Sequence, residues 1–186
     1  MGELVAWARG LAALRMADEL PQRWAHVHAV AAKAENLRPV LDGDAELVVA
    51  AAWLHDVGYA STVTDSGLHA LDGARLLRSL DADSRLIGLV AYHSGARYEA
   101  ELRGLGTELA AFHDEASFTR DALWFCDMTT GPSGETMTFD ERLAEIDLRY
   151  GSDHNVTLAI KKAADDIRAA VANVLTRVAQ YGLAIR

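Results

Sequence analysis

One apolar segment that ends in two polar residues most constrains how this chain can fold. Residues 47–54 (LVVAAAWL) are apolar throughout, and His55 and Asp56 follow directly. A helix that is apolar on every side is normally buried. Burying a carboxylate beside an imidazole costs free energy unless another group pairs with them, and a divalent metal ion can bind both side chains. The segment therefore predicts a buried helix whose end needs a partner of this kind.

The rest of the chain favours an all-α fold, with residues 1–186 forming a single compact helical bundle. A chain of 186 residues can bury a sizeable core, and only three prolines interrupt a sequence rich in Ala, Leu and Arg. We find no convincing strand. We expect a core that carries the motifs over residues 20–130, and C-terminal helices over residues 138–181 that pack on it.

Helical periodicity and the placement of Gly, Pro and capping residues divide the chain into helices. Asp44 is expected to cap the third helix, and Asp81 or Asp83 the fifth. Loops are expected over residues 62–67 and 131–135. Helices are expected over residues 3–18, 23–37, 44–58, 69–80, 84–95, 96–106, 107–116, 117–130, 138–151 and 153–181, of which 96–106 could also be an ordered loop.

Charge and cysteine content limit the classes of partner. The net charge is −9 and no Lys/Arg-rich run occurs, which argues against a protein that binds extended DNA or RNA. A small anionic substrate fits, because bound metal cations would invert the local charge. The single cysteine, Cys126, allows no intrachain disulfide and is expected to be a core thiol. No apolar stretch is long enough to span a membrane, so we expect a cytoplasmic protein without a membrane partner.

Further histidines and one more aspartate stand in settings like that of the first pair, at helix ends or on inward helix faces. Asp127 follows four apolar residues, so it needs a partner for the same reason as Asp56. Each residue alone could be a helix cap or a surface group, but those explanations would all have to hold together. His28, His113 and His154 have polar or acidic neighbours and are expected on the surface. The candidate ligands are His26, His55, Asp56, His69, His93 and Asp127.

This pattern resembles the HD superfamily of metal-dependent phosphohydrolases. The resemblance rests on RWAHVHAVA (residues 23–31), on the His-Asp doublet in LHDVGY (residues 54–59), and on Asp127 in a late helix. It implies an HD-domain-like fold in which the primary metal is held by His26, His55, Asp56 and Asp127.

Two more histidines extend the resemblance. His69 in LHALDGARLL and His93 in AYHSG are similar to the additional histidines of family members that hold two metals, most closely the bacterial dinucleoside tetraphosphate hydrolases. The doublet is not followed by the lysine or the GYP motif of HD-GYP cyclic dinucleotide phosphodiesterases. The substrate of that family is therefore not supported. The doublet also lacks the nearby glutamate that helps to activate water in the 5′-nucleotidase branch.

The resemblance implies a hydrolase that holds one or two divalent metal ions, with Fe or Mn favoured and Mg, Co, Ni or Zn also compatible. Asp56 would bridge two ions, with His55 and Asp56 at the catalytic centre. A metal-bound hydroxide would then attack a small phosphoester, with a nucleotide or dinucleotide as the leading candidate.

Three residues are the main candidate contacts to that substrate, and a fourth is a weaker one. Arg23 lies one helical turn before His26 and could contact a phosphate, although a structural salt bridge would suit it equally well. Arg97 and Tyr98 follow the His-Ser-Gly segment and could line the entrance, and Arg75 is a weaker candidate.

Two other functions share this pattern of ligands. Some HD-fold proteins with the same pattern resemble mixed-valence di-iron oxygenases, and a metal-stabilised binding protein without turnover would also need these ligands.

The long C-terminal helix carries an apolar stripe, which packing on its own domain explains as well as a homodimer does.

Overall fold

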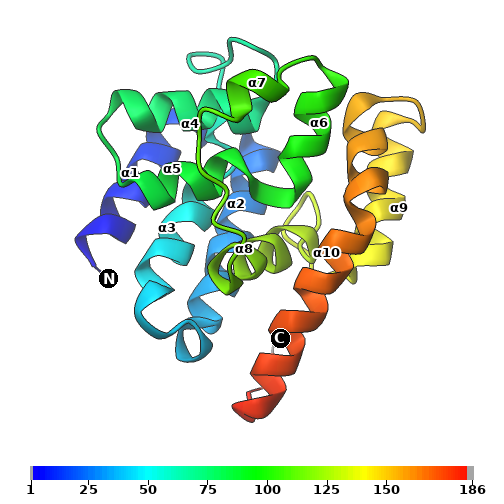
Figure 1. Cartoon of the computed structure of the whole chain (residues 1–186). Helices are drawn as coiled ribbons and strands as arrows, with labels where there is room; N and C mark the ends of the chain where they lie inside the picture. The colour runs from blue at the N-terminus through cyan, green and yellow to red at the C-terminus, as the bar shows by residue number, and fades with distance from the viewer. Residues whose placement is uncertain (1, 184–186) are drawn as a thin grey trace.

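A computed structural model describes residues 2–183, so residue 1 and residues 184–186 of the predicted domain lie outside the described part. The predicted all-α fold class is confirmed (Figure 1). Within the described part, β pairing is limited to an isolated bridge between Thr130 and Thr136. No described helix combines the length and the apolar composition needed to cross a membrane.

The helices follow one another with short connections. The α-helices are α1 (Glu3–Met16), α2 (Pro21–Asn36), α3 (Ala45–Leu54), α4 (His69–Ser79), α5 (Ser84–Ala91), α6 (Ala96–Leu102), α7 (Gly106–Leu109), α8 (Phe118–Met128), α9 (Phe139–Tyr150) and α10 (Asn155–Gln180). Short 3-10 turns are η1 (Arg38–Val40), η2 (Asp42–Asp44), η3 (Val57–Tyr59) and η4 (His93–Gly95).

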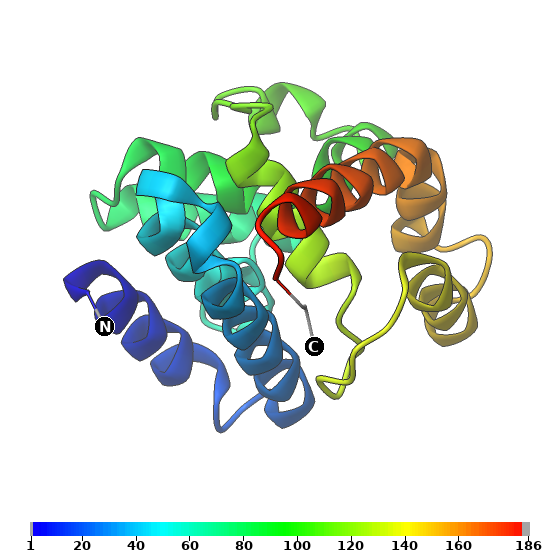
Figure 2. The same ribbon diagram turned by 90° about the horizontal axis from the view of Figure 1, so that it is seen from below.

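The apolar helix α3 lies at the centre of the main hydrophobic core. It packs against α1, α2, α5 and α8, and all of its residues from Val48 to Leu54 are buried. Figure 2 shows α1 and α2 lying together on one side of the molecule, next to α3. Because helices cover α3 on every side, the two polar residues that follow it enter the interior.

A second, smaller core lies between α8, α9 and α10. Leu123 of α8 packs in the main core, whereas Trp124 and Met128 of the same helix pack with Ile146 of α9 and Ile160 of α10. The long helix α10 runs across α8 and also contacts α6 and α9 (Figures 1 and 2). α8 therefore joins the two cores.

The expected cap of the third helix is wrong. The Asp44 side chain makes no capping hydrogen bond, and its carboxylate instead accepts hydrogen bonds from Arg85 at 2.8 and 2.7 Å and from Thr119 at 2.6 Å. These contacts tie the start of α3 to α5 and α8, and the carboxylate is therefore not directed at the backbone N–H groups of its own helix. Asp83 caps α5, as one of the two predicted alternatives.

The helix predicted over residues 107–116 is also wrong, because it shrinks to the single turn of α7. Residues beyond it follow an irregular path against α5, where a Cβ built on Gly88 would lie 2.3 Å from the carbonyl oxygen of His113. Ala116 has a φ of 43°, which a helix does not allow. Close backbone packing thus overrides the helical propensity of this segment.

Gly58 gives a test of how closely the turn after α3 packs on α4. A Cβ at this position would lie 1.9 Å from the carbonyl oxygen of His69 and 2.8 Å from the backbone nitrogen of Gly73. Because backbone atoms cannot move aside cheaply, Gly58→Ala should lower the free energy of unfolding by about 1–3 kcal/mol. Urea denaturation followed by circular dichroism measures this loss.

Gly10→Ala is the matched control. Gly10 lies inside α1, and nothing stands within 4 Å of a Cβ built there. Alanine should therefore stabilise the protein by about 0.5–1 kcal/mol through helix propensity alone. Equal stability of Gly58→Ala and the wild type would show that the two segments are not in tight contact.

Candidate metal centre

All six predicted ligands meet in the interior. α2 supplies one histidine, the turn between α3 and η3 supplies the His-Asp doublet, and α4, η4 and α8 supply one residue each. Five of the six residues are buried, and His69 is partly buried. Segments that are far apart in the sequence therefore contribute to one cluster, whose members are His26, His55, Asp56, His69, His93 and Asp127.

Asp56 lies between two pairs of histidines. Its Oδ2 atom is 3.4 Å from Nε2 of His55 and 3.9 Å from Nε2 of His26. Its Oδ1 atom is 3.5 Å from Nε2 of His69 and 3.9 Å from Nε2 of His93. The two oxygens thus face different pairs, and among the described residues each pair with Asp56 forms a group that could hold a metal ion.

Asp127 joins the first of these groups. Its Oδ1 atom is 3.1 Å from Nε2 of His26 and 3.8 Å from Nε2 of His55. The hydroxyl of Ser94 donates a hydrogen bond to the other oxygen. Ser94 has a φ of 46° and Gly95 a φ of 76°; the helix predicted to continue to residue 95 is wrong, because α5 ends at Ala91 and this left-handed turn follows it. A strained non-glycine residue therefore orients a candidate ligand.

Three of the histidines share one arrangement of their ring nitrogens. In each ring Nδ1 lies next to a backbone carbonyl, which can only accept, so Nδ1 carries a proton and Nε2 is the nitrogen that can bind a metal ion once it has lost its own proton. The contacts join His26 to Gly131 at 2.9 Å, His55 to Ala52 at 2.8 Å and His93 to Val90 at 2.7 Å.

The Nε2 atoms of these rings face carboxylate oxygens. Within the described part of the chain, Nε2 of His55 is buried without any hydrogen-bond partner. A cation between the nitrogens and the carboxylates of Asp56 and Asp127 would satisfy all of these groups together, and a carbonyl on the opposite ring nitrogen is the usual support of a metal-binding histidine. The residues present thus fit a divalent metal ion.

Both carboxylates are ionised at neutral pH. Burial favours the neutral acid, but Arg23 and His55 hold the pKa of Asp56 well below its usual range. Burial acts in the same direction on Asp127, where the hydrogen bond with His26 and the charge of His55 hold the pKa far below its usual value. The cluster therefore presents two negative charges to a cation.

The histidines differ in their charge. Burial lowers the pKa of His69 and of His93, so both rings are neutral at neutral pH and can act as ligands. Burial also opposes charge on His55, but Asp56 and Asp127 raise its pKa to about 9. A metal ion that binds His55 must therefore displace a proton.

Arg23 forms the salt bridge that was one of its two predicted roles. Its Nη1 atom lies 2.9 Å from Oδ2 of Asp56. Its guanidinium lies 4.2 Å from the ring centre of Tyr59, and that ring stacks on His69 at 4.1 Å. The guanidinium and the His69 ring cannot both lie on the same face of Tyr59 at these distances, so the Tyr59 ring lies between them. This stack connects Arg23, which pairs with Oδ2 of Asp56, to His69, which faces Oδ1.

The loop before α4 is held by one buried carboxylate. Asp72 accepts hydrogen bonds from the backbone of Asp65 at 3.0 Å, of Ser66 at 3.0 Å and of Gly67 at 3.3 Å. The hydroxyl of Ser66 donates a further one at 2.7 Å. Asp72 therefore fixes the segment that leads into His69.

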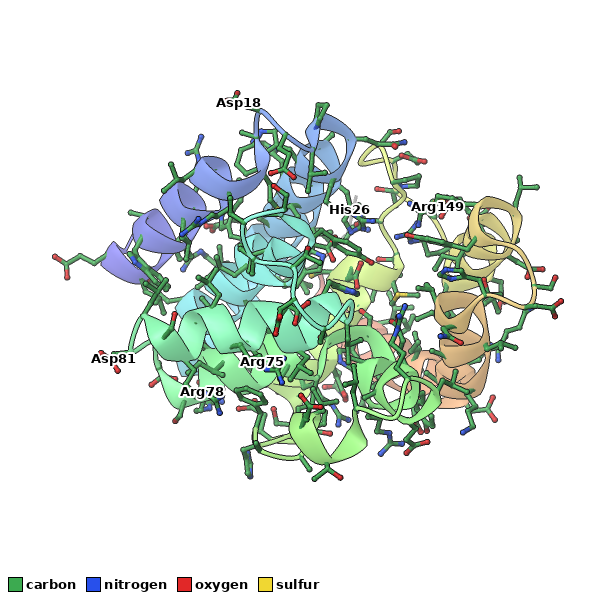
Figure 3. All side chains as sticks on the ribbon, turned by 90° about the horizontal axis from the view of Figure 1, so that it is seen from above. Asp18, His26, Arg75, Arg78, Asp81 and Arg149 are labelled. Carbon is green, nitrogen blue, oxygen red and sulfur yellow. The ribbon has the colours of Figure 1, made fainter. Side chains whose placement is uncertain are left out.

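A cavity of about 60 Å³ opens over the ligand cluster. That volume accommodates only a few water molecules. Figure 3 shows Arg149 reaching from α9 toward the part of the molecule that carries His26. On the ligand side the cavity is lined by Arg23, Asp56, Tyr59, His69, His93, Ser94, Glu99 and Asp127. The opposite wall, from α9 and the start of α10, consists of Arg142, Ile146, Arg149, Tyr150, Val156, Ala159 and Ile160.

Two predicted substrate contacts are placed elsewhere. Arg97 and Tyr98 do not line this cavity, because both bind the same carboxylate oxygen of Asp166 on α10, each at 2.7 Å. The left-handed turn at residues 94–95 directs this segment toward α10. Arg75 of α4 pairs with Asp65 and Glu108 on the surface, also outside the cavity (Figure 3).

The remaining predictions about single side chains agree with the structure. His28, His113 and His154 are exposed, as expected. Cys126 is a buried free thiol, and burial raises its pKa to about 12, so it has no thiolate character at neutral pH.

Sequence reasoning missed a buried lysine that supports the end of α8. Lys33 donates hydrogen bonds to the backbone carbonyl of Thr129 at 2.5 Å and to its hydroxyl at 2.9 Å. Burial lowers the pKa of Lys33. The lysine stands seven positions after His26, so the helical period could have placed it on the same inward face. The α9 residues that line the cavity had no such signal.

Comparisons with known proteins agree with this geometry. A family model described as HD domain matches residues 23–170. The tRNA (cytidine(56)-2′-O)-methyltransferase of Picrophilus torridus is 36% identical over 85 residues, which are 46% of this chain and 24% of that protein. The chain thus spans about a quarter of the length of this relative. No solved structure matches the chain. The match to the family model covers most of the sequence, so the chain belongs to the HD-domain superfamily of metal-dependent phosphohydrolases.

Proposed function

We propose that this protein is a metal-dependent phosphohydrolase that cleaves a small phosphoester, with nucleotides and dinucleotides as the first candidates. The observation that carries the proposal is the position of Asp56, whose two oxygens face two separate histidine pairs at the floor of a cavity. Two metal sites that share one carboxylate suit the transfer of a phosphoryl group to water.

The residues around Asp56 would have different roles in such a reaction. Divalent ions bound here would lower the pKa of water and neutralise charge on the phosphate. Arg23 lines the cavity beside Asp56 and could contact a phosphate oxygen while it keeps its salt bridge. Backbone carbonyls hold the histidine rings, so the ligands need no rearrangement.

We do not propose methyl transfer. The name of the relative describes a tRNA methyltransferase, and this chain matches only about a quarter of that protein. A buried cluster of histidines and carboxylates serves metal-assisted hydrolysis, and the net charge of −9 is unfavourable for tRNA.

Metal content gives the first test of the proposal. Protein loaded with Mn²⁺ or Fe²⁺ should hold two ions per chain, because Asp56 serves both histidine pairs. His69→Ala should hold one ion, because it removes a ligand from one side alone. Asp56→Ala should retain neither ion tightly. Elemental analysis after gel filtration measures the stoichiometry.

His28→Ala is the control for this series, because His28 is exposed and lies outside the cluster. It should hold two ions. Two tightly held ions in His69→Ala would contradict the assignment of this histidine to a second site.

Ser94 gives a separate prediction about metal affinity. Removing its hydroxyl frees one oxygen of Asp127, so Ser94→Ala should weaken metal binding roughly 10–100-fold. Ser94→Gly removes the same hydroxyl but suits the left-handed backbone, and it should lose affinity to the same extent. Titration with Mn²⁺ measures both variants. If only the alanine variant is weakened, backbone strain and not the hydroxyl is the cause.

Turnover separates the hydrolase from its alternatives. The loaded protein should hydrolyse at least one member of a panel of phosphomonoesters, nucleotides and dinucleoside polyphosphates. Asp56→Ala should lower the rate by about 100-fold or more, beyond the loss expected from a residue that only supports a ligand. Chromatography of the reaction products under nitrogen and under air provides the measurement.

Two results would reject the hydrolase. One is turnover that needs oxygen, accompanied by a mixed-valence EPR signal after iron loading, which would identify a di-iron oxygenase. The other is hydrolysis that persists at the wild-type rate in Asp56→Ala.

A further inference from the structure

Two arginines of α9 face the metal centre from the opposite wall of the cavity. Arg142 and Arg149 line the same cavity as Asp56 and His69, although their helix α9 packs in the second hydrophobic core. The candidate metal ligands do not require them: the ion pairs of Asp56 and Asp127 involve Arg23 and the histidines of the cluster. The presence of two more guanidinium groups at the cavity therefore calls for another explanation.

The two arginines share a single carboxylate. Glu145 accepts a hydrogen bond from Nη1 of Arg142, and its Oε1 atom lies 3.1 Å from Nε of Arg149. Two positive charges with one negative partner leave this wall with an excess positive charge. Glu145 also fixes both guanidinium groups, so little conformational freedom would be lost when they bind an anion.

Arg142 is the more unusual of the pair. It is only 3% exposed, and its Nε–H group is buried with no hydrogen-bond partner among the described residues. An unsatisfied buried donor on a charged group is costly. Arg142 nevertheless lines the cavity, so an anion bound there would compensate the buried charge of its guanidinium.

The aromatic residues of this wall keep Arg149 in place. Its guanidinium lies 4.6 Å from the ring centre of Tyr150, and that ring stacks on His154 at 5.0 Å with an angle of 22° between the planes. A capping box between Thr138 and Glu141 fixes the start of α9. The wall is thus built on a rigid helix, which favours precise recognition.

We propose that Arg142 and Arg149 bind the terminal oxygens of a phosphate monoester whose phosphorus faces the metal centre. The inference rests on the proposed function and narrows its substrate class. Guanidinium groups match the geometry of phosphate oxygens, and a monoester offers more free oxygens and more negative charge than a diester.

Binding of inorganic phosphate to the metal-loaded protein tests this site directly. Isothermal titration with the wild type should show binding, and Arg149→Gln should weaken it at least about tenfold. Arg142→Met should have a similar effect, and its circular dichroism spectrum shows whether it folds. Arg168→Gln is the matched control, because Arg168 pairs with Asp140 of α9 and does not line the cavity. It should bind phosphate as the wild type does.

Kinetic constants add a second readout. Arg149→Gln should raise KM for a phosphomonoester and the inhibition constant of phosphate together, while the metal content stays at the wild-type value. If Arg142→Met does not fold, Arg149→Gln decides the outcome. Unchanged phosphate affinity in Arg149→Gln, or no phosphate binding by the wild type, would overturn the proposed anion site.

The two proposals fail in different ways. If no phosphoester is hydrolysed but phosphate binding depends on Arg149, the anion site stands and the hydrolase does not. If phosphomonoesters are hydrolysed but Arg149→Gln leaves KM and phosphate binding unchanged, the hydrolase stands and the anion site is wrong. A clear preference for phosphodiesters over monoesters in the wild type would also reject the proposed substrate class.

Discussion

The buried carboxylate of Asp56 is the constraint on which the surrounding structure depends. α3 is apolar on all sides, so it must be covered by other helices, and the residue that follows its end must enter the interior. A buried charge without partners would cost more than most single interactions contribute. The neighbouring helices meet this need with Arg23 and with the histidine rings that face both oxygens. The arrangement of α2, α4 and α8 around α3 is therefore also the arrangement of the candidate metal ligands.

Much of the structure around the cluster serves to keep side chains still. Backbone carbonyls fix three of the histidine rings, and Asp72 holds the loop that leads into His69. Ser94 adopts a left-handed backbone conformation that costs about 1–3 kcal/mol in general, and in return its hydroxyl reaches Asp127. A site that must bind cations among like-charged carboxylates gains from such rigidity, because the carboxylates cannot turn away from one another.

The candidate ligand cluster was predictable from the sequence, because its histidines and aspartates stand at helix ends or on inward helix faces and match the motifs of the HD superfamily. The long helices followed from periodicity for the same reason. The local failures have a common cause in contacts made across the fold. Asp44 leaves its helix for Arg85, and His113 passes over Gly88, neither of which a local pattern reveals. Arg142 and Arg149 were missed because their helix carries no motif, and only the packing of α9 on α10 brings it to the cavity.

The two walls of the cavity belong to helices that pack in different hydrophobic cores. The candidate ligands belong to helices of the main core, whereas the arginines of the opposite wall belong to α9, which packs in the second core. α8 takes part in both cores and carries Asp127 where they meet. A change on the α9 wall can therefore alter the charge and shape of the cavity without moving a ligand. Under the two proposals, the metal centre would determine the kind of reaction, and α9 of the second core would determine which anion binds.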